Sequence, residues 1–106
     1  MARILLVEDS VDIADLITHY LERAGHVVDR LATGTGVVVR ARNSAPDLVV
    51  LDLMLPGMDG LHVCQGLRAD RATAAIPVIM VTARESVPGQ PAQTYTLASD
   101  VRLRNP

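Results

Sequence analysis

Three carboxylates and one hydroxyl stand where apolar runs of this chain end. Glu8 and Asp9 follow the first such run, Asp52 ends another, and Thr82 follows a third. Carboxylate oxygens are ligands that Mg²⁺ prefers, and carboxylates crowded into one crevice raise one another's pKa unless a cation neutralises them. A carboxylate beside bound Mg²⁺ can also attack a phosphoryl group. These residue types indicate metal binding and phosphoryl transfer wherever the fold brings them together.

Four segments have the composition of strands that would position these residues. Continuous apolar runs at residues 4–7, 48–51 and 77–81 predict buried strands, and a weaker strand begins at Val27. Helical segments separate the strands, so the order predicts a parallel α/β sheet built from right-handed βαβ units. Because the carboxyl ends of parallel strands meet at one edge of a sheet, where ligands bind, the acidic side chains are expected to converge there.

The intervening helices are marked with different clarity. Residues 12–24 carry apolar side chains at the spacing of an amphipathic helix, with Ser10 or Asp9 as its cap and Gly25 at its end. A second helix is predicted over residues 34–43, although glycine and β-branched residues lower its propensity. A third helix is predicted before the fourth strand.

The composition restricts the class of protein. The 106 residues, of which 49% are hydrophobic, are expected to form one domain with an aliphatic core, since the chain has no Phe or Trp. The formal net charge of −2 argues against direct nucleic-acid binding. The single cysteine, Cys64, has no partner for an internal disulfide, and no apolar run suits a signal peptide or a membrane span. A cytoplasmic location without membrane association is therefore expected.

Each candidate residue has a plainer interpretation when it is taken alone. An acidic pair after a strand is usually a solvated loop or a helix cap, an aspartate there is often a turn residue, and threonine is common in strands. Their conjunction at one edge of one predicted sheet is what favours a cation or phosphate site.

These motifs resemble those of the receiver domain of two-component response regulators. The motifs that carry the resemblance are Glu8-Asp9, the segment DLMLPGMDG at residues 52–60 and the segment VTAR at residues 81–84. They extend over about residues 3–84, and few other families place them in this order. The resemblance implies a flavodoxin-like, doubly wound parallel sheet of order 2-1-3-4-5 with helices on both faces.

The resemblance also implies roles for the acidic residues. Asp52 would accept a phosphoryl group from the phosphohistidine of a sensor histidine kinase or phosphotransfer protein, in a Mg²⁺-dependent reaction. Asp9, Asp52 and the backbone carbonyl of Met54 would hold Mg²⁺, and Glu8 would assist through water. Such a chain is a phospho-accepting signalling domain of a phosphorelay and not an independent enzyme.

Residues at the ends of the fourth and fifth strands would complete the phosphoryl pocket. By resemblance, Thr82 would be the switch hydroxyl that follows the phosphoryl group, and Ala83 would leave room for that group. The family also carries a lysine on its fifth strand, whereas all ten basic residues of this chain are arginines. Arg104 stands about where that lysine is expected, and its planar fork is not equivalent to an ammonium point charge.

Residues 85–106 depart from the family pattern and are expected to form a divergent tail within a single receiver domain of residues 1–106, with no effector domain. Prolines replace the family's fourth helix, nothing remains for a fifth, and residues 101–103 are a candidate short strand. Two explanations stay open: a shortened variant receiver, or a reading-frame change or truncation after Arg84, which the abrupt end of the match favours. The fold is therefore expected to be incomplete at its C-terminus, and the exposed sheet face favours a homodimer.

Two other functions stay open beside a phosphorylatable receiver. A non-switching pseudo-receiver or truncated remnant would act only through protein–protein contacts, and the missing lysine favours it. A different flavodoxin-like module, for a nucleotide or flavin, would need a glycine-rich phosphate loop after the first strand, where this chain has an acidic pair.

Overall fold

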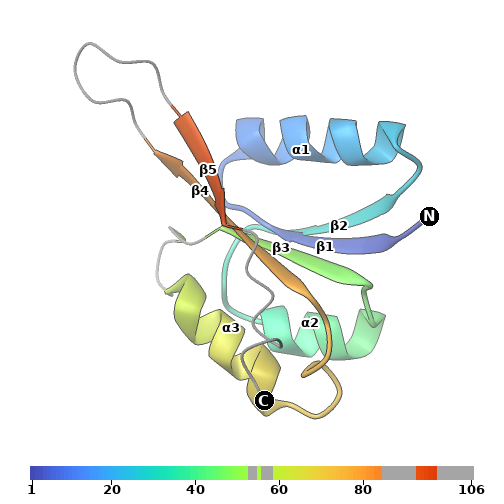
Figure 1. The fold of residues 1–106 in the computed structure, drawn as a ribbon, viewed down its shortest axis with the longest axis vertical. Coiled ribbons are helices and arrows are strands. Elements are labelled where there is room, and N and C mark those ends of the chain that lie inside the picture. Colours follow the sequence, from blue (N-terminus) through green and yellow to red (C-terminus); the bar gives the residue numbers. More distant parts are fainter. Residues whose placement is uncertain (53–54, 56–58, 85–92, 98–106) are drawn as a thin grey trace.

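A twisted five-stranded sheet lies between helices on both faces (Figure 1). The structure is a computed structural model that describes residues 1–52, 55, 59–84 and 93–97, with only the backbone described for residues 82–84 and 93–97. The elements in chain order are β1 (Arg3–Val7), α1 (Val11–Arg23), β2 (Val27–Leu31), α2 (Val37–Ser44), β3 (Leu48–Asp52), α3 (Gly60–Ala69), β4 (Val78–Arg84) and β5 (Gln93–Leu97). Within these ranges, no helix combines the length and apolar character needed to cross a membrane.

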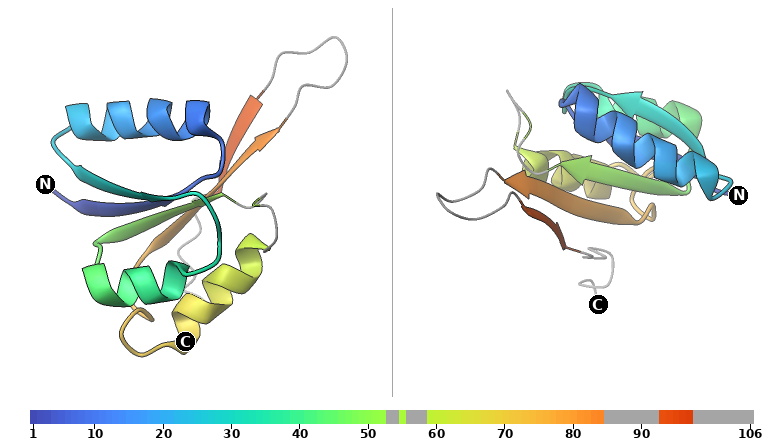
Figure 2. Two further views of the ribbon diagram at one scale, coloured as in Figure 1. Left: turned by 180° about the vertical axis from the view of Figure 1, so that it is seen from behind. Right: turned by 90° about the horizontal axis from the view of Figure 1, so that it is seen from above.

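The first four strands form the predicted parallel sheet. Their order is β2-β1-β3-β4, and Leu5 of the inner strand β1 lies opposite Asp29 of β2 on one side and Val49 of β3 on the other. Helix α1 covers one face, and α2 with α3 covers the other, as both views in Figure 2 show. The prediction of a doubly wound, flavodoxin-like sheet is therefore confirmed for these four strands.

The fifth strand takes the expected place in the order but the opposite direction. β5 pairs antiparallel with β4, with Thr82 opposite Tyr95, so the prediction of an all-parallel order 2-1-3-4-5 is wrong for this strand. The physical reason is the length of the connection. Only residues 85–92 join β4 to β5, whereas a parallel crossover needs about a dozen residues or more. The candidate strand at residues 101–103 lies outside the described residues.

Alternation along the strands divides the core into two layers. On the side of α2 and α3, the buried side chains include Leu5, Leu51 and Leu67, each with no exposed surface. On the side of α1, Leu6 and Ala14 anchor the second layer. Burial of one such leucine side chain contributes roughly 1.5–3 kcal/mol, so the two layers hold β1 and β3 firmly in place.

Helix α1 begins and ends as the sequence predicts. Ser10 is its N-cap, and the Ser10 hydroxyl accepts a hydrogen bond of 3.3 Å from the Ile13 N–H. Gly25 follows the C-cap with a φ of 92°, a left-handed conformation that glycine adopts without strain. The apolar stripe is only partly covered, because Leu16 and Tyr20 are 56% and 64% exposed.

Helix α2 starts three residues later than predicted. Gly36 is its N-cap and has a φ of 85°, a left-handed conformation that cannot continue into a helix on its N-terminal side. Residues 34–36 therefore belong to the preceding loop, and the prediction of a helix from residue 34 is wrong at this end. The helix itself buries Val37 and Ala41 against the sheet.

Helix α3 is tied to the start of β4 by side chains near its C-terminus. The Arg68 guanidinium donates to the carbonyls of Ala74 and Ile76, and the fully buried Thr73 hydroxyl donates to the Leu67 carbonyl at 2.7 Å. The Thr73 bond satisfies a carbonyl that the helix end leaves without an intrahelical donor, and the Arg68 bonds satisfy carbonyls of the loop that follows. They fix the loop from which β4 enters the sheet, where Val78 pairs with Val49.

Candidate acidic metal site

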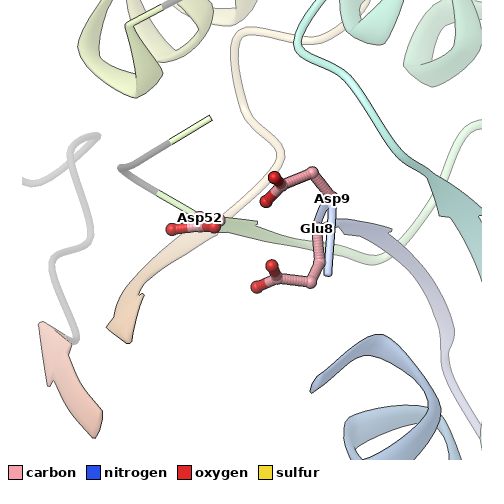
Figure 3. Close-up of side chains that lie close together, drawn as sticks. All are labelled: Glu8, Asp9 and Asp52. Atoms are coloured by element: carbon pink, nitrogen blue, oxygen red, sulfur yellow. The ribbon is translucent and has the colours of Figure 1, made fainter. Parts of the chain in front are cut away.

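The carboxylates of Glu8, Asp9 and Asp52 meet at the carboxyl ends of β1 and β3 (Figure 3). One oxygen from each residue lies within 4.8 Å of the others. The register explains the meeting, because Val7 pairs with Leu51 and each of these residues is followed directly by an acid, Glu8 or Asp52. The structure therefore brings together the three carboxylates that the sequence places after two apolar runs.

The site has a buried floor and an open side. Glu8 and Asp52 are only 2% and 5% exposed, whereas Asp9 is exposed. Figure 3 shows the carboxylates of Glu8 and Asp9 both directed toward the side on which Asp52 lies. An ion entering past Asp9 would reach two acids that have little other contact with water.

Burial changes the chemistry of Glu8. The pKa of its carboxyl is raised from 4.5 to about 7, first by burial and then by the charge and hydrogen bonding of Asp52 and by hydrogen bonding to Asp9. The Ser10 N–H, which donates to Glu8 Oε2 at 3.0 Å, works in the opposite direction. Burial and the neighbouring acids outweigh the Ser10 hydrogen bond, so a proton or a cation is needed to neutralise this group of acids.

The donor set fits a hard divalent cation. All three side chains offer carboxylate oxygens, which Mg²⁺ and Ca²⁺ prefer over nitrogen and sulfur ligands. The raised pKa of Glu8 is the expected property of carboxylates that share a site without a metal. Mg²⁺ usually takes one or two carboxylates and keeps several waters, and the exposed side of Asp9 leaves room for them.

The other predicted site residues are described incompletely. Val81 pairs with Asp52, so Thr82 and Ala83 are the next two residues of β4 at the same sheet edge, while their side chains lie outside the described set. Met54 and Arg104, predicted as a metal ligand and as a substitute for lysine, also lie outside the described residues.

Sequence reasoning missed one residue next to the site. Arg30, on β2, donates through Nε and Nη2 to the carbonyl oxygen of Glu8, at 3.3 Å and 3.1 Å. The only signal for it in the sequence is a basic residue near the end of the second predicted strand. Its partners are backbone carbonyls, which leave no trace in the pattern of side chains.

Comparison with known proteins identifies the family. Residues 4–98 match the family described as response regulator receiver domain. The chain is 48% identical to the DNA-binding dual master transcriptional regulator RpaA of Synechocystis over 83 residues. The aligned stretch covers 78% of this chain and 34% of RpaA. It is 41% identical to protein PilH of Pseudomonas aeruginosa over 85 residues, and this aligned stretch covers 80% of this chain and 70% of PilH.

Solved structures agree with this match. The N-terminal domain of a response regulator receiver protein from Methanoculleus marisnigri has a TM-score of 0.75 and 36% identity, over 83% of this chain and 72% of that one. The receiver domain of the sensor histidine kinase PA1611 of Pseudomonas aeruginosa, with a magnesium ion coordinated in its active site cleft, has a TM-score of 0.71 and 30% identity, over 74% of this chain and 65% of that one.

The match extends over only part of the larger relatives. This chain spans about one third of the length of RpaA and of the DNA-binding response regulator MtrA of Mycobacterium tuberculosis, to which it is 43% identical over 82 residues. It spans 70% of PilH. The family match, the parallel sheet and the acidic edge agree with one another, and the chain belongs to the response regulator receiver domain family, whose members act in phosphorelay signalling.

Proposed function

We propose that this chain accepts a phosphoryl group on Asp52 from the phosphohistidine of a sensor histidine kinase or phosphotransfer protein, in a Mg²⁺-dependent reaction. The observation that carries the proposal is the group of three carboxylates within 4.8 Å at the carboxyl edge of a receiver-type sheet. Asp52 is the member that ends the central strand β3, where its carboxylate is held by the strand and not by a loop.

In this proposal Asp9, Asp52 and the carbonyl of Met54 hold Mg²⁺, and Glu8 assists through water. When bound, Mg²⁺ would offset the charge of the carboxylates and of the transferring phosphoryl oxygens. A carboxylate oxygen of Asp52 attacks phosphorus, the bond from phosphorus to the histidine nitrogen breaks, and that nitrogen leaves with the bonding electrons. The buried floor formed by Glu8 and Asp52 limits the access of water.

Two further residues of β4 are assigned to the phosphoryl group. The Thr82 hydroxyl would donate to a phosphoryl oxygen, and the small side chain of Ala83 would leave room for the group to approach. Their place directly after the Asp52–Val81 pair supports the assignment. Arg104 is the proposed substitute for the family's lysine, since arginine is the only strongly basic residue type in the sequence.

A non-switching pseudo-receiver is the second candidate function. It is favoured by the antiparallel direction of β5, which replaces the parallel fifth strand that the resemblance implies, and by the absence of lysine from the sequence. Such a chain would keep the acidic site but act only through protein–protein contacts. Under either function we treat residues 1–106 as one cytoplasmic receiver unit.

The surface of α1 supports a protein partner rather than a nucleic acid. Leu16 and Tyr20 are exposed on this helix, and the formal net charge of the chain is −2. A sensor kinase or phosphotransfer protein is one partner of the proposal, and a second copy of the chain is the other. A strictly monomeric protein by light scattering would contradict the homodimer.

Intact-mass spectrometry with a small phosphodonor tests the proposal. Wild-type protein should gain the mass of one phosphoryl group when both acetyl phosphate and Mg²⁺ are present, and the Asp52→Asn variant should gain nothing. Asp15→Asn is the matched control, because Asp15 is an exposed acid on α1 away from the site. Mg²⁺ binding without labelling of the wild type would select the pseudo-receiver instead.

A further inference from the structure

Arg30 joins strand β2 to the acidic loop through the backbone. Its guanidinium donates to the Glu8 carbonyl oxygen from Nε at 3.3 Å and from Nη2 at 3.1 Å, and Nη2 makes a longer contact of 3.4 Å to the Asp9 carbonyl oxygen. The bonds to Glu8 are the stronger ones by length. One rigid, planar group therefore reaches two consecutive peptide carbonyls of the loop that supplies two of the three carboxylates.

The register explains why this arginine and no neighbouring residue reaches the loop. Arg30 lies opposite Leu6 in the β1–β2 ladder, and the Glu8 N–H continues that ladder by donating to the Leu31 carbonyl at 2.9 Å. The main chain of Glu8 is thus held at both ends: its N–H by Leu31 and its carbonyl by Arg30. The Glu8 carboxylate in turn accepts from the Ser10 N–H.

The hydrogen bonds described for Arg30 all end on backbone carbonyls and none on a carboxylate. Arg30 consequently does not neutralise the acids as an ion-pair partner would. The effect of the guanidinium on the site is one of geometry.

We propose that Arg30 is a positioning residue of the cation site, which fixes the peptides after Glu8 and Asp9 so that their carboxylates converge on Asp52. The inference rests on the proposed Mg²⁺ function and goes beyond it by naming the residue that sets the geometry.

A positioning role for Arg30 predicts different effects on the binding of Mg²⁺ and of Ca²⁺. Mg²⁺ demands a near-ideal octahedron, whereas Ca²⁺ accepts six to eight ligands in flexible arrangements. Loosening the loop should therefore weaken Mg²⁺ more than Ca²⁺.

Titration calorimetry of the full chain with Mg²⁺ and Ca²⁺ tests this distinction. Arg30→Met keeps most of the apolar stem and removes the donors, and loss of such a supporting contact typically lowers metal affinity about 10–100-fold. We expect the Mg²⁺ dissociation constant to rise about tenfold and the Ca²⁺ constant to rise roughly threefold or less. Arg30→Lys, with one ammonium group for two carbonyls, should give an intermediate ratio of the two constants.

Arg40→Met is the matched control. Arg40 also bonds a residue of β2, through an ion pair of 2.7 Å with Asp29, but it does not contact the acidic loop in the described structure. Its loss should leave both metal affinities unchanged. Thermal unfolding of each variant without metal shows whether a change in affinity merely follows a change in stability.

Four outcomes are decisive. Wild-type affinities in Arg30→Met would overturn the role of Arg30 and leave the proposed function intact. An equal loss for both ions, in step with lower metal-free stability, would make Arg30 a purely structural residue and also overturn the inference. If Arg30→Met does not fold, an unchanged ion ratio in Arg30→Lys overturns it. Absence of Mg²⁺ binding by the wild type would overturn the proposed function and this inference with it.

Discussion

Glu8 and Asp52 are carboxylates from neighbouring strands that lie together at one sheet edge with only 2% and 5% of their surfaces exposed. One carboxylate oxygen of each lies within 4.8 Å of the other, and two buried acids so close together oppose each other's ionisation. In the metal-free protein the conflict is resolved at Glu8, whose pKa is raised to about 7. The stability of the fold is thereby linked to pH and to cation binding.

The metal-free protein should lose stability as the pH rises from about 4.5 to about 7. The folded pKa of Glu8 lies above the unfolded value of 4.5, so the folded state binds more protons in this window and the Glu8 contribution is lost as the carboxyl ionises. Urea unfolding in the presence of a chelator measures this slope. Glu8→Gln should flatten it, and a wild-type stability that rises steadily across the window would contradict the prediction.

Added Mg²⁺ should stabilise the protein more at pH 8 than at pH 5.5. At the lower pH the ion must displace a proton from Glu8, whereas at the higher pH the site is ionised and the ion removes its repulsion. At 100 times the dissociation constant, binding to the folded state alone contributes about 2.7 kcal/mol. The shift in melting temperature at the two pH values is the measurement. Equal shifts would show that Glu8 is not part of the cation site.

Removing the charge at position 52 should stabilise the protein while abolishing its proposed function. Asp52→Asn deletes the like charge beside Glu8, which is one of the causes after burial that raise the Glu8 pKa, and we expect the free energy of unfolding to rise in metal-free buffer at pH 8. Denaturant unfolding measures the gain. Asp15→Asn, on the exposed face of α1, should change stability little, and a destabilised Asp52→Asn protein would count against the electrostatic account.

The hydroxyl of Thr73 should matter for the entry of β4 into the sheet. Thr73 has no exposed surface, and its hydroxyl donates to the Leu67 carbonyl at 2.7 Å. Thr73→Val keeps the shape but leaves that carbonyl without the donor, which costs about 1–3 kcal/mol. Thr35→Val, at an exposed loop position, is the control and should be near neutral. Equal stabilities of the two variants would show that the bond does not hold the loop.

Much of the site could be predicted because it follows from strand ends. The apolar run before Asp52 has the composition of a doubly covered strand, and parallel pairing then carries its end to that of the strand before Glu8. The start of α2 could not be predicted as well, since the left-handed conformation of Gly36 competes with helix formation in a way that composition does not show.

The role of Arg30 and the direction of β5 depend on information that local patterns lack. Arg30 bonds carbonyls that only the β1–β2 register brings near, so nothing in the spacing of side chains marks it. β5 reverses because residues 85–92 are too few for a crossover, a constraint that becomes visible only once the strand at residues 93–97 is known. The resemblance to the family suggested the opposite direction.

Mapping the phosphorylated residue tests the central claim most directly. After treatment with acetyl phosphate and Mg²⁺, the acyl phosphate is reduced with borohydride and the protein is cleaved after arginine. Asp52 then falls in the peptide of residues 43–68, apart from Glu8 and Asp9. The account predicts a single reduced residue, at Asp52, which depends on Mg²⁺ and is lost in Asp52→Asn. Modification at another acid, or none in the wild type, would contradict it.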